Sequence, residues 1–406
     1  MIRADFVVRR VGELVTMVPR DGDALGRITK AAFAARQGRV VWVGKDQDVE
    51  ASVGLDGDSL DAAGACIIPG LVDAHTHPVF AGSRADEFVE RQTGISYQAQ
   101  QASERGIMRT VRATREADAP TLTALARIRV QRFLASGTTT IEAKTGYGLD
   151  QANESKAFDV LLALSGGASC RIVPTFLGAH VVPGGVDRAA YLRVLLEEML
   201  PAFRRRAVFC DAWCDEPAFT PAETRALLRR AQQLGYLVRV HAAQLGPGEG
   251  PDIAAELGAA SADHLEYVTQ QQVEALVAAG TVAVLCPSAN LTTHGPRPPI
   301  EGMRKAGLRM AVASDLNPGT SNSENLIFAM SLACVAWGMT PLEVLAGATV
   351  HAAHSLRLDG LAGCLQVGSY ADCAILDVES AEAIPYYLGT NRVMQTVVGG
   401  SIWEPS

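Results

Sequence analysis

The chain lacks any long apolar run: no stretch approaches the ~18 consecutive apolar residues of a membrane-spanning helix. The N-terminus has an acidic residue, Asp5, and lacks the apolar core of a secretory signal peptide. A basic surplus is missing too, because the formal net charge is −8 and the one basic run is the short stretch 204–206. These absences argue against a membrane protein, a secreted protein and a nucleic-acid-binding surface.

Cysteine is present but scattered. The eight cysteines stand at positions 66, 170, 210, 214, 286, 334, 364 and 373, several of them inside apolar runs typical of strands. In a chain of 406 residues this distribution predicts reduced, buried thiols and a cytoplasmic protein. For the close pair Cys210 and Cys214 we favour core packing, with a metal role as the alternative.

Both ends of the chain have the pattern of β structure. Residues 1–66 contain short β-like pieces separated by Gly and Asp turns, and no long amphipathic helix. Residues 360–406 contain two more such pieces, at 368–377 and 393–400. We therefore expect the two ends to form one small composite β-sandwich domain.

Residues 67–359 alternate between strand and helix patterns, which indicates an α/β fold. Strands are expected at 66–74, 138–143, 171–177, 207–213, 236–241, 260–264, 281–286 and 308–314. Helices are expected at stretches such as 120–136, 188–203, 221–234 and 269–279. Eight β/α units are typical of a TIM barrel, (β/α)8. A doubly wound open sheet is the alternative, disfavoured because no Gly-x-Gly-x-x-Gly turn opens the first unit.

The pair His75 and His77 follows the first expected barrel strand. Residues i and i+2 of a strand point to the same face, so the two imidazoles project side by side, as needed to bind one metal ion. Two unrelated polar histidines would give the same pattern. However, active sites of TIM barrels lie at the strand ends, and other polar residues fall there too.

Further polar residues follow the other expected strands. They are Lys144 after strand two, His180 after strand three, His241 and Gln244 after strand five, Asp263 and His264 in strand six, and Asp315 with Asn317 after strand eight. Each alone is compatible with a structural role, since an Asp after a strand is often a helix cap. Together, imidazoles and a carboxylate on one rim predict a site for a divalent metal.

Several longer motifs around these positions resemble those of a known protein family. They are residues 73–88 (Asp-Ala-His-Thr-His-Pro-Val-Phe-Ala-Gly-Ser-Arg-Ala-Asp-Glu-Phe), 94–97, 142–149 (Glu-Ala-Lys-Thr-Gly-Tyr-Gly-Leu), 176–180, 261–267 and 315–320. With them, nearly the whole chain resembles the imidazolonepropionases, hydrolases of histidine degradation in the amidohydrolase superfamily. The His-x-His pair is shared across that superfamily, whereas the segments around Arg84 and Tyr147 are far more specific.

The resemblance implies one metal ion, zinc or iron, held by His75, His77, His241 and Asp315. It implies that a water activated by this ion opens the cyclic amide of 4-imidazolone-5-propanoate to give N-formimidoyl-L-glutamate. Asp315 would carry the proton, and His264 would orient the water or stabilise the oxyanion. Some relatives hold two metals with a lysine after strand four; residues 204–220 contain no lysine, which favours a single metal.

The resemblance also implies a substrate pocket. Arg84 would bind the carboxylate tail, because a guanidinium meets a carboxylate in bidentate fashion. A surface ion pair of Arg84 with Asp86 or Glu87 is the alternative. The remaining substrate-binding positions implied by the family are Tyr97, Tyr147, His180, Gln244, Asn317, Gly319 and Thr320. A homodimer is expected by resemblance only.

The chain departs from the family pattern in two places. Residues 241–244 read His-Ala-Ala-Gln where relatives commonly read His-Ala-Glu-Gln, and the loop 285–290 differs as well.

Three other functions stay open at this stage. A deaminase of a heterocyclic base would use the same metal ligands but would not need Arg84, a hydantoin-type hydrolase would be expected to have the strand-four lysine, and a non-catalytic barrel would have no reason to retain all four ligands.

Overall fold

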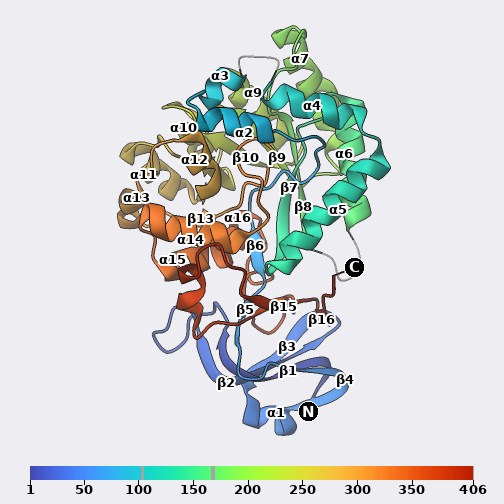
Figure 1. Ribbon diagram of the computed structural model, residues 1–406, viewed down its shortest axis with the longest axis vertical. Helices are drawn as coiled ribbons and strands as arrows, with labels where there is room; N and C mark the ends of the chain where they lie inside the picture. Colours follow the sequence, from blue (N-terminus) through green and yellow to red (C-terminus); the bar gives the residue numbers. More distant parts are fainter. Residues whose placement is uncertain (102–104, 166–169, 406) are drawn as a thin grey trace.

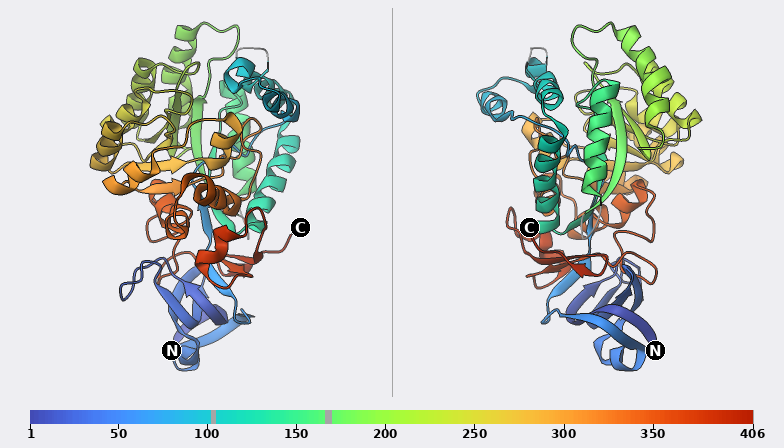
Figure 2. Two further views of the ribbon diagram at one scale, coloured as in Figure 1. Left: turned by 60° about the vertical axis from the view of Figure 1, so that its left-hand side comes forward. Right: turned by 90° about the vertical axis from the view of Figure 1, so that its right-hand side faces the viewer.

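The structure, a computed structural model, describes residues 1–101, 105–165 and 170–405. In Figure 1 a strand barrel surrounded by helices forms the upper part, and a sheet built from both ends of the chain lies beneath it. Figure 2 shows the C-terminal strands, in red, between the barrel and the N-terminal strands, in blue. Within the described part of the chain, no helix has the length and apolarity to cross a membrane.

The barrel has eight parallel strands, each paired with its sequence neighbour. They are β6 (Leu71–Asp73), β7 (Thr138–Lys144), β8 (Arg171–Ala179), β9 (Phe209–Cys214), β10 (Leu237–Ala242), β11 (Ser261–His264), β12 (Val282–Leu285) and β13 (Met310–Val312). The first and last strands meet just beyond their ends, where the Asp315 N–H donates to the His75 carbonyl over 3.0 Å. The expected barrel is confirmed, and the open sheet is excluded.

The apolar run 66–74, expected as one strand, is two strands. β5 (Cys66–Pro69) pairs with β1 and β14 of the terminal sheet, whereas β6 belongs to the barrel. Gly70 separates them, and a Cβ atom there would lie only 2.2 Å from the Thr139 Oγ1 atom on β7. The chain therefore passes from one sheet to the other at a point where only glycine fits.

Helices surround the barrel and start at capping residues. The Asp118 side chain caps α5 (Ala119–Ala135), and capping boxes at Thr220 and Thr269 start α9 (Pro221–Gln233) and α11 (Gln270–Ala279). The expected helix 188–203 is continuous but contains a π-helical turn. Its parts are α7 (Arg188–Val194), η2 (Leu195–Met199) and α8 (Leu200–Phe203).

Among the other helices around the barrel, α6 and α14 are the longest. They are α2 (Ala85–Gln92), α3 (Tyr97–Gln101), α4 (Ile107–Glu116), α6 (Gln151–Leu164), α10 (Gly250–Glu256), α12 (Pro287–Thr293), α13 (Ile300–Ala306), α14 (Leu326–Trp337), α15 (Pro341–Gly347) and α16 (Val350–Ser355). In Figure 1, α2, α3 and α4 lie at the top of the barrel, above the carboxyl ends of its strands.

The terminal sheet combines both ends of the chain, as expected. Its strand order is β16-β15-β14-β5-β1-β2-β3, with β4 also paired to β1. The strands are β1 (Ile2–Val15), β2 (Arg27–Arg36), β3 (Arg39–Lys45), β4 (Val53–Asp61), β14 (Cys373–Leu376), β15 (Val393–Val398) and β16 (Ser401–Ile402). Two short helices lie against this sheet, η1 (Asp46–Asp48) and α1 (Val49–Ser52), whereas η3 (Ala381–Tyr386), between β14 and β15 in the chain, contacts α14 and α15 of the barrel.

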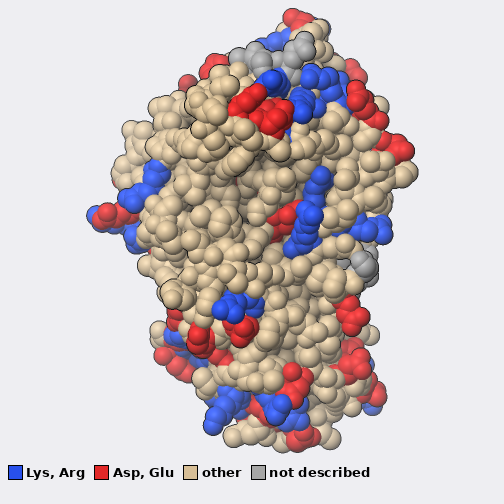
Figure 3. All heavy atoms as spheres, viewed as in Figure 1, with Lys and Arg blue, Asp and Glu red and all other residues tan. Residues whose placement is uncertain are grey.

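The apolar core is divided between the two parts. The larger cluster fills the space between barrel strands and helices and includes Phe133, Phe158 and Phe176. A smaller cluster lies in the terminal sheet around Leu14 and Phe33. All eight cysteines are free, and every one except Cys334 is buried, which agrees with the expected burial. On the face drawn in Figure 3, basic groups lie dispersed among acidic ones.

A buried hydrogen bond joins the terminal sheet to the barrel. The Thr396 hydroxyl on β15 donates to the Leu134 carbonyl near the end of α5 over 2.6 Å. Thr396→Val removes this donor, and the Leu134 carbonyl keeps the Gly137 N–H, 3.0 Å away. The substitution should therefore lower the free energy of unfolding by about 0.5–1.5 kcal/mol, the net contribution of one hydrogen bond. Urea denaturation measures this. Thr390→Val, at an exposed site, is the matched control, and equal small effects of both substitutions would contradict the prediction.

Candidate active site and metal centre

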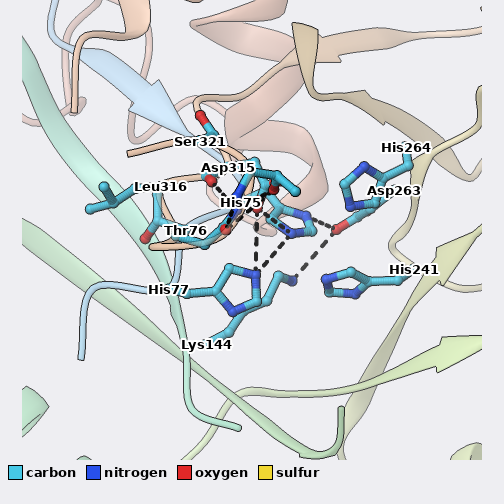
Figure 4. A network of polar contacts seen from close by, with 12 residues as sticks. His75, Thr76, His77, Lys144, His241, Asp263, His264, Asp315, Leu316 and Ser321 are labelled. Atoms are coloured by element: carbon cyan, nitrogen blue, oxygen red, sulfur yellow. Dashed lines mark hydrogen bonds and ion pairs between the residues drawn. The ribbon is translucent and has the colours of Figure 1, made fainter. Parts of the chain in front are cut away.

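Three histidines and one aspartate converge at the carboxyl ends of the barrel strands. His75 and His77 follow β6, His241 lies on β10 and Asp315 follows β13. The His75 and His77 Nε2 atoms are 3.3 Å apart, and the Asp315 Oδ1 atom lies 3.5 and 3.6 Å from them. One ligand atom from each of the three histidines lies within 4.8 Å of the others. Figure 4 shows the four side chains directed toward a common point.

These distances fit a metal site. With metal–nitrogen bonds of ~2.0–2.1 Å, tetrahedral ligands lie about 3.3 Å apart. The tautomers agree, because the His75 Nδ1 atom lies 2.7 Å from Asp263 Oδ2 and so carries the proton. Its Nε2 lone pair then faces a second imidazole nitrogen and a carboxylate oxygen, an arrangement that a cation between them would stabilise. Burial lowers the pKa of all three histidines, which keeps them neutral and able to bind metal.

Two buried carboxylates orient these histidines from behind. Asp263 on β11 contacts His75, and Asp211 on β9 lies 2.9 Å from the His241 Nδ1 atom. Burial opposes ionisation of Asp211, but the nearby His241 and Lys144 outweigh it and lower its pKa. An ionised carboxylate behind a ligand histidine fixes the ring and increases its basicity. Asp263 does not face its neighbour His264, because successive residues of β11 point to opposite sides and Asp263 points to His75.

A layer of five fully buried charges lies beneath the ligands. We call it the ionic layer; it consists of Glu142, Lys144, Asp211, Arg239 and Asp263. The Lys144 ammonium lies 2.8 Å from Glu142, 2.7 Å from Asp211 and 3.5 Å from Asp263. Arg239 lies 3.4 Å from Asp263. Each carboxylate is therefore balanced by at least one cation, which burial requires.

Asp315 and His264 have strained backbones and shifted pKa values. Their φ angles are +51° and +79°, in the left-handed region that non-glycine residues seldom adopt. Burial raises the pKa of Asp315 to about 7, against the opposing effect of His264. Burial opposes protonation of His264, but Glu266, 3.8 Å away, and Asp315 outweigh it and raise its pKa to about 9. Asp315, a candidate proton acceptor, and His264, a cationic hydrogen-bond donor, thus lie beside the three candidate ligand histidines.

Arg84 lies on the other side of the pocket from the ionic layer. Its side chain is 4% exposed, and its Nε atom donates to Glu87 Oε2 over 2.8 Å. The ion pair that we weighed as an alternative is therefore real, but it is buried and engages only one edge of the guanidinium. Among the described residues, Nη2 has no hydrogen-bond partner. Arg84 thus keeps a free donor at the pocket.

The loop after β13 is shaped around this arginine. The Asn317 Oδ1 atom accepts from the backbone N–H groups of Gly319 and Thr320, both at 2.8 Å. A Cβ atom on Gly319 would lie 2.3 Å from the Arg84 Nη1 atom, so glycine is needed for the arginine to pack there. The Asn317 amide also donates to the Asp315 carbonyl. Asn317 therefore fixes the loop that holds Asp315 and faces Arg84.

The remaining pocket residues are aromatic or neutral polar groups. His180 donates through Nδ1 to the Gly146 carbonyl, and burial, followed by His241, lowers its pKa to about 3, so the ring is neutral. Burial raises the pKa of Tyr97 and Tyr147, which keeps both phenols protonated. The cavity among them has a volume of only about 30 Å³. That volume holds a water molecule, so a ring-sized ligand requires these side chains to move apart.

The structure brings together nearly all the residues expected from the sequence. The pocket lining includes His77, Arg84, Tyr97, Tyr147, His180, His241, Gln244, His264, Asp315, Asn317 and Thr320. His75 is fully buried directly behind the pocket. Gly319 packs against Arg84, and Arg84 in turn lines the pocket.

Sequence reasoning missed the ionic layer and two carboxylates near Gln244. Asp215 accepts from the Gln244 N–H over 3.0 Å, and Glu266 lies beside His264. The one carboxylate of the loop after β10, Glu249, pairs with Arg225 at the surface, whereas the loops after β9 and β11 each place a carboxylate near the pocket. Strand alternation could have placed Glu142 and Lys144 on one face of β7.

Comparison with known proteins agrees with this geometry. The Amidohydrolase family matches residues 66–403. An imidazolonepropionase of Acidiphilium cryptum is 39% identical over 96% of this chain and 98% of its own length. One from Symbiobacterium thermophilum is 40% identical over 98% and 97%. A zinc-bound adenosine deaminase structure from Xanthomonas campestris has a TM-score of 0.73 at 17% identity, covering 99% of this chain and 93% of that one, and supports the fold alone.

Asp211→Asn tests the role of the ionic layer in metal binding. The substitution preserves shape but removes the charge behind His241, so the affinity for a divalent metal should fall about 10- to 100-fold. Competition with a chromophoric chelator measures it. Asp377→Asn, at a side chain that is 68% exposed, is the control. Equal metal affinity in both variants would show that the carboxylate does not support the ligand.

Proposed function

The chain belongs to the amidohydrolase family and, within it, to the imidazolonepropionases, and from this we propose that it hydrolyses 4-imidazolone-5-propanoate to N-formimidoyl-L-glutamate in histidine degradation. One observation carries the proposal: a metal-ligand cluster and a buried arginine with a free donor line the same pocket. The cluster suits attack on a ring carbonyl, and Arg84 suits a carboxylate tail.

We propose that His75, His77, His241 and Asp315 hold a single divalent ion, zinc or iron. Three imidazoles and one carboxylate suit either metal. Bound there, the ion acidifies a water molecule toward neutral pH and supplies the nucleophile. A single ion is consistent with the ionic layer, where the Lys144 ammonium already balances Asp211 and Asp263.

Asp315 and His264 divide the remaining chemistry. The Asp315 carboxylate accepts a proton from the attacking water and returns it to the ring nitrogen when the carbonyl C–N bond breaks. His264, held protonated by Glu266 and Asp315, donates a hydrogen bond to the oxygen on which negative charge develops. Gln244 cannot act as a base, because its side chain is a neutral amide.

The rest of the pocket positions the substrate. Arg84 binds the propanoate carboxylate, while Tyr97, Tyr147, His180, Gln244 and Thr320 contact the ring and chain. Asn317 and Gly319 act by holding the loop that shapes the pocket. We also propose a cytoplasmic location, supported by the free cysteines, and a homodimer, on the family resemblance alone.

The proposed reaction is tested with the two possible substrate classes. The metal-loaded protein should consume imidazolonepropanoate and release formimidoylglutamate, and a chelator should abolish the activity reversibly. The decrease in absorbance of the imidazolone ring measures the loss of substrate, and mass spectrometry identifies the product. Release of ammonia from purines or pyrimidines, without ring opening of imidazolonepropanoate, would instead make the protein a deaminase.

Arg84→Gln should weaken substrate binding. Loss of a buried charge pair with the tail costs ~2–4 kcal/mol of transition-state stabilisation, measured as kcat/KM. Arg229→Gln, a surface arginine paired with Glu256, is the matched control and should leave kcat/KM unchanged. Kinetics of Arg84→Gln that match those of the control would remove Arg84 from the site.

Asp315→Asn should abolish turnover, because the amide accepts no proton at neutral pH. Metal should remain partly bound through the three histidines, which chelator competition can quantify alongside the rate. Measurable turnover by a variant with full metal content would contradict the proton-transfer role.

A further inference from the structure

A second cavity lies on the far side of Arg84 from the metal ligands. Its volume is about 470 Å³, and it shares Arg84 and Thr320 with the catalytic pocket, so these two residues form the partition. Its other walls come from α2, α5, α12, α14 and the loop after β13. We call this cavity the vestibule; its charged lining residues are Arg84, Arg91, Arg129, Arg132 and Glu324.

The vestibule is cationic in an acidic protein. Four arginines line it against one glutamate, although the whole chain has a net charge of −8. Glu324 lies 3.5 Å from Arg132, and Arg84 is paired with Glu87. Arg91 and Arg129 form no ion pair with any residue that the structure describes. Figure 3 shows basic atoms beside an acidic group on this face, between the positions of α5 and α14 in Figure 1.

The two unpaired arginines are buried, and their hydrogen bonds among the described residues go to neutral acceptors; Arg129 also lies over the Phe80 ring, 3.4 Å from its centroid. Arg129, 9% exposed, donates to the Pro78 and Phe80 carbonyls over 2.8 and 2.9 Å. Arg91, 5% exposed, donates to the Gln100 amide oxygen and the Gly319 carbonyl, and its Nε atom has no partner within the described residues. Burial lowers the pKa of both side chains, that of Arg129 to about 10.

Burying a cation without a counter-anion is unfavourable, and an anion in the adjoining space offsets the cost. The space suits a small molecule, since 470 Å³ lies within the range of ligand pockets. Arginine forks and the hydroxyl of Ser288, which also lines the cavity, are donors suited to carboxylates. The apolar rings of Phe88 and Phe328 complete a lining fit for a short carbon chain with a charged end.

We propose that the vestibule is a second binding site, for small mono- and dicarboxylates, which holds anionic molecules next to the catalytic pocket. The arrangement of the arginines alone supports a carboxylate-binding site. The role of that site in catalysis rests on the proposed function, in which the substrate has one carboxylate and opening of its ring creates a second. The vestibule thus collects the substrate on its way in and accepts the dicarboxylate product on its way out.

Binding of glutarate to the metal-loaded protein tests the site. Isothermal titration should show two sites in the wild type. Arg132→Gln changes a side chain that is 65% exposed and outside the packed core. It should weaken one of the two sites about fivefold or more, and Arg129→Gln should do the same. Arg127→Gln, on the exposed face of the same helix, is the matched control and should bind as wild type.

Two outcomes would overturn the proposed site. Glutarate binding that falls only in Arg84→Gln would place all of it in the catalytic pocket. Displacement of glutarate by equimolar chloride or sulfate from the site affected by Arg132→Gln would show a general anion site without carboxylate selectivity.

Kinetics then separate this inference from the proposed reaction. With imidazolonepropanoate, Arg132→Gln should raise KM about fivefold, and Arg127→Gln should leave it unchanged. Turnover with a KM that is the same in both variants would refute the role of the vestibule in substrate traffic but keep the proposed reaction. Glutarate binding at the vestibule without turnover of imidazolonepropanoate would refute the reaction and keep the site.

Discussion

The buried ion pairs between Lys144 and two aspartates are the constraint on which the site depends. Asp211 and Asp263 each contact one ligand histidine, and each also contacts the same ammonium group. Burial at zero exposure requires such a cation for Asp211, and Asp263 has Arg239 as a second one. The ring positions of His75 and His241 are therefore set by charges that no solvent reaches, and a preformed candidate metal site follows.

The fold connects this layer to the pocket. The barrel closes where the backbone after β13 meets that after β6, and the residues joined there are Asp315 and His75. Closure of the sheet and assembly of the metal site are thus one structural event. The same loop continues through Asn317 to Gly319, whose missing side chain admits Arg84. A single segment accordingly links the metal side of the pocket to its anion-binding side.

The sequence predicted the barrel strands and the residues that converge as candidate metal ligands, because these depend on local pattern. Short apolar runs and polar residues at their ends are visible without knowing any contact. The division of the run 66–74 into two strands, β5 and β6, could not be predicted from local pattern, because it depends on the approach of Thr139 to Gly70. Lys144 is the last residue of the second barrel strand, and nothing local shows that its ammonium crosses the interior to Asp211 on the fourth. The contact between Asp263 and His75 could not be predicted for the same reason.

The metal position tests the account most directly. Anomalous diffraction at the absorption edge of the bound metal, on crystals of the metal-loaded protein, should show one peak within bonding distance of the Nε2 atoms of His75, His77 and His241 and the carboxylate of Asp315. Asp211 and Asp263 should remain on the Nδ1 side of the rings, in contact with Lys144. A peak among Asp211, His241 and Asp263, a group that could also hold an ion, would contradict the account.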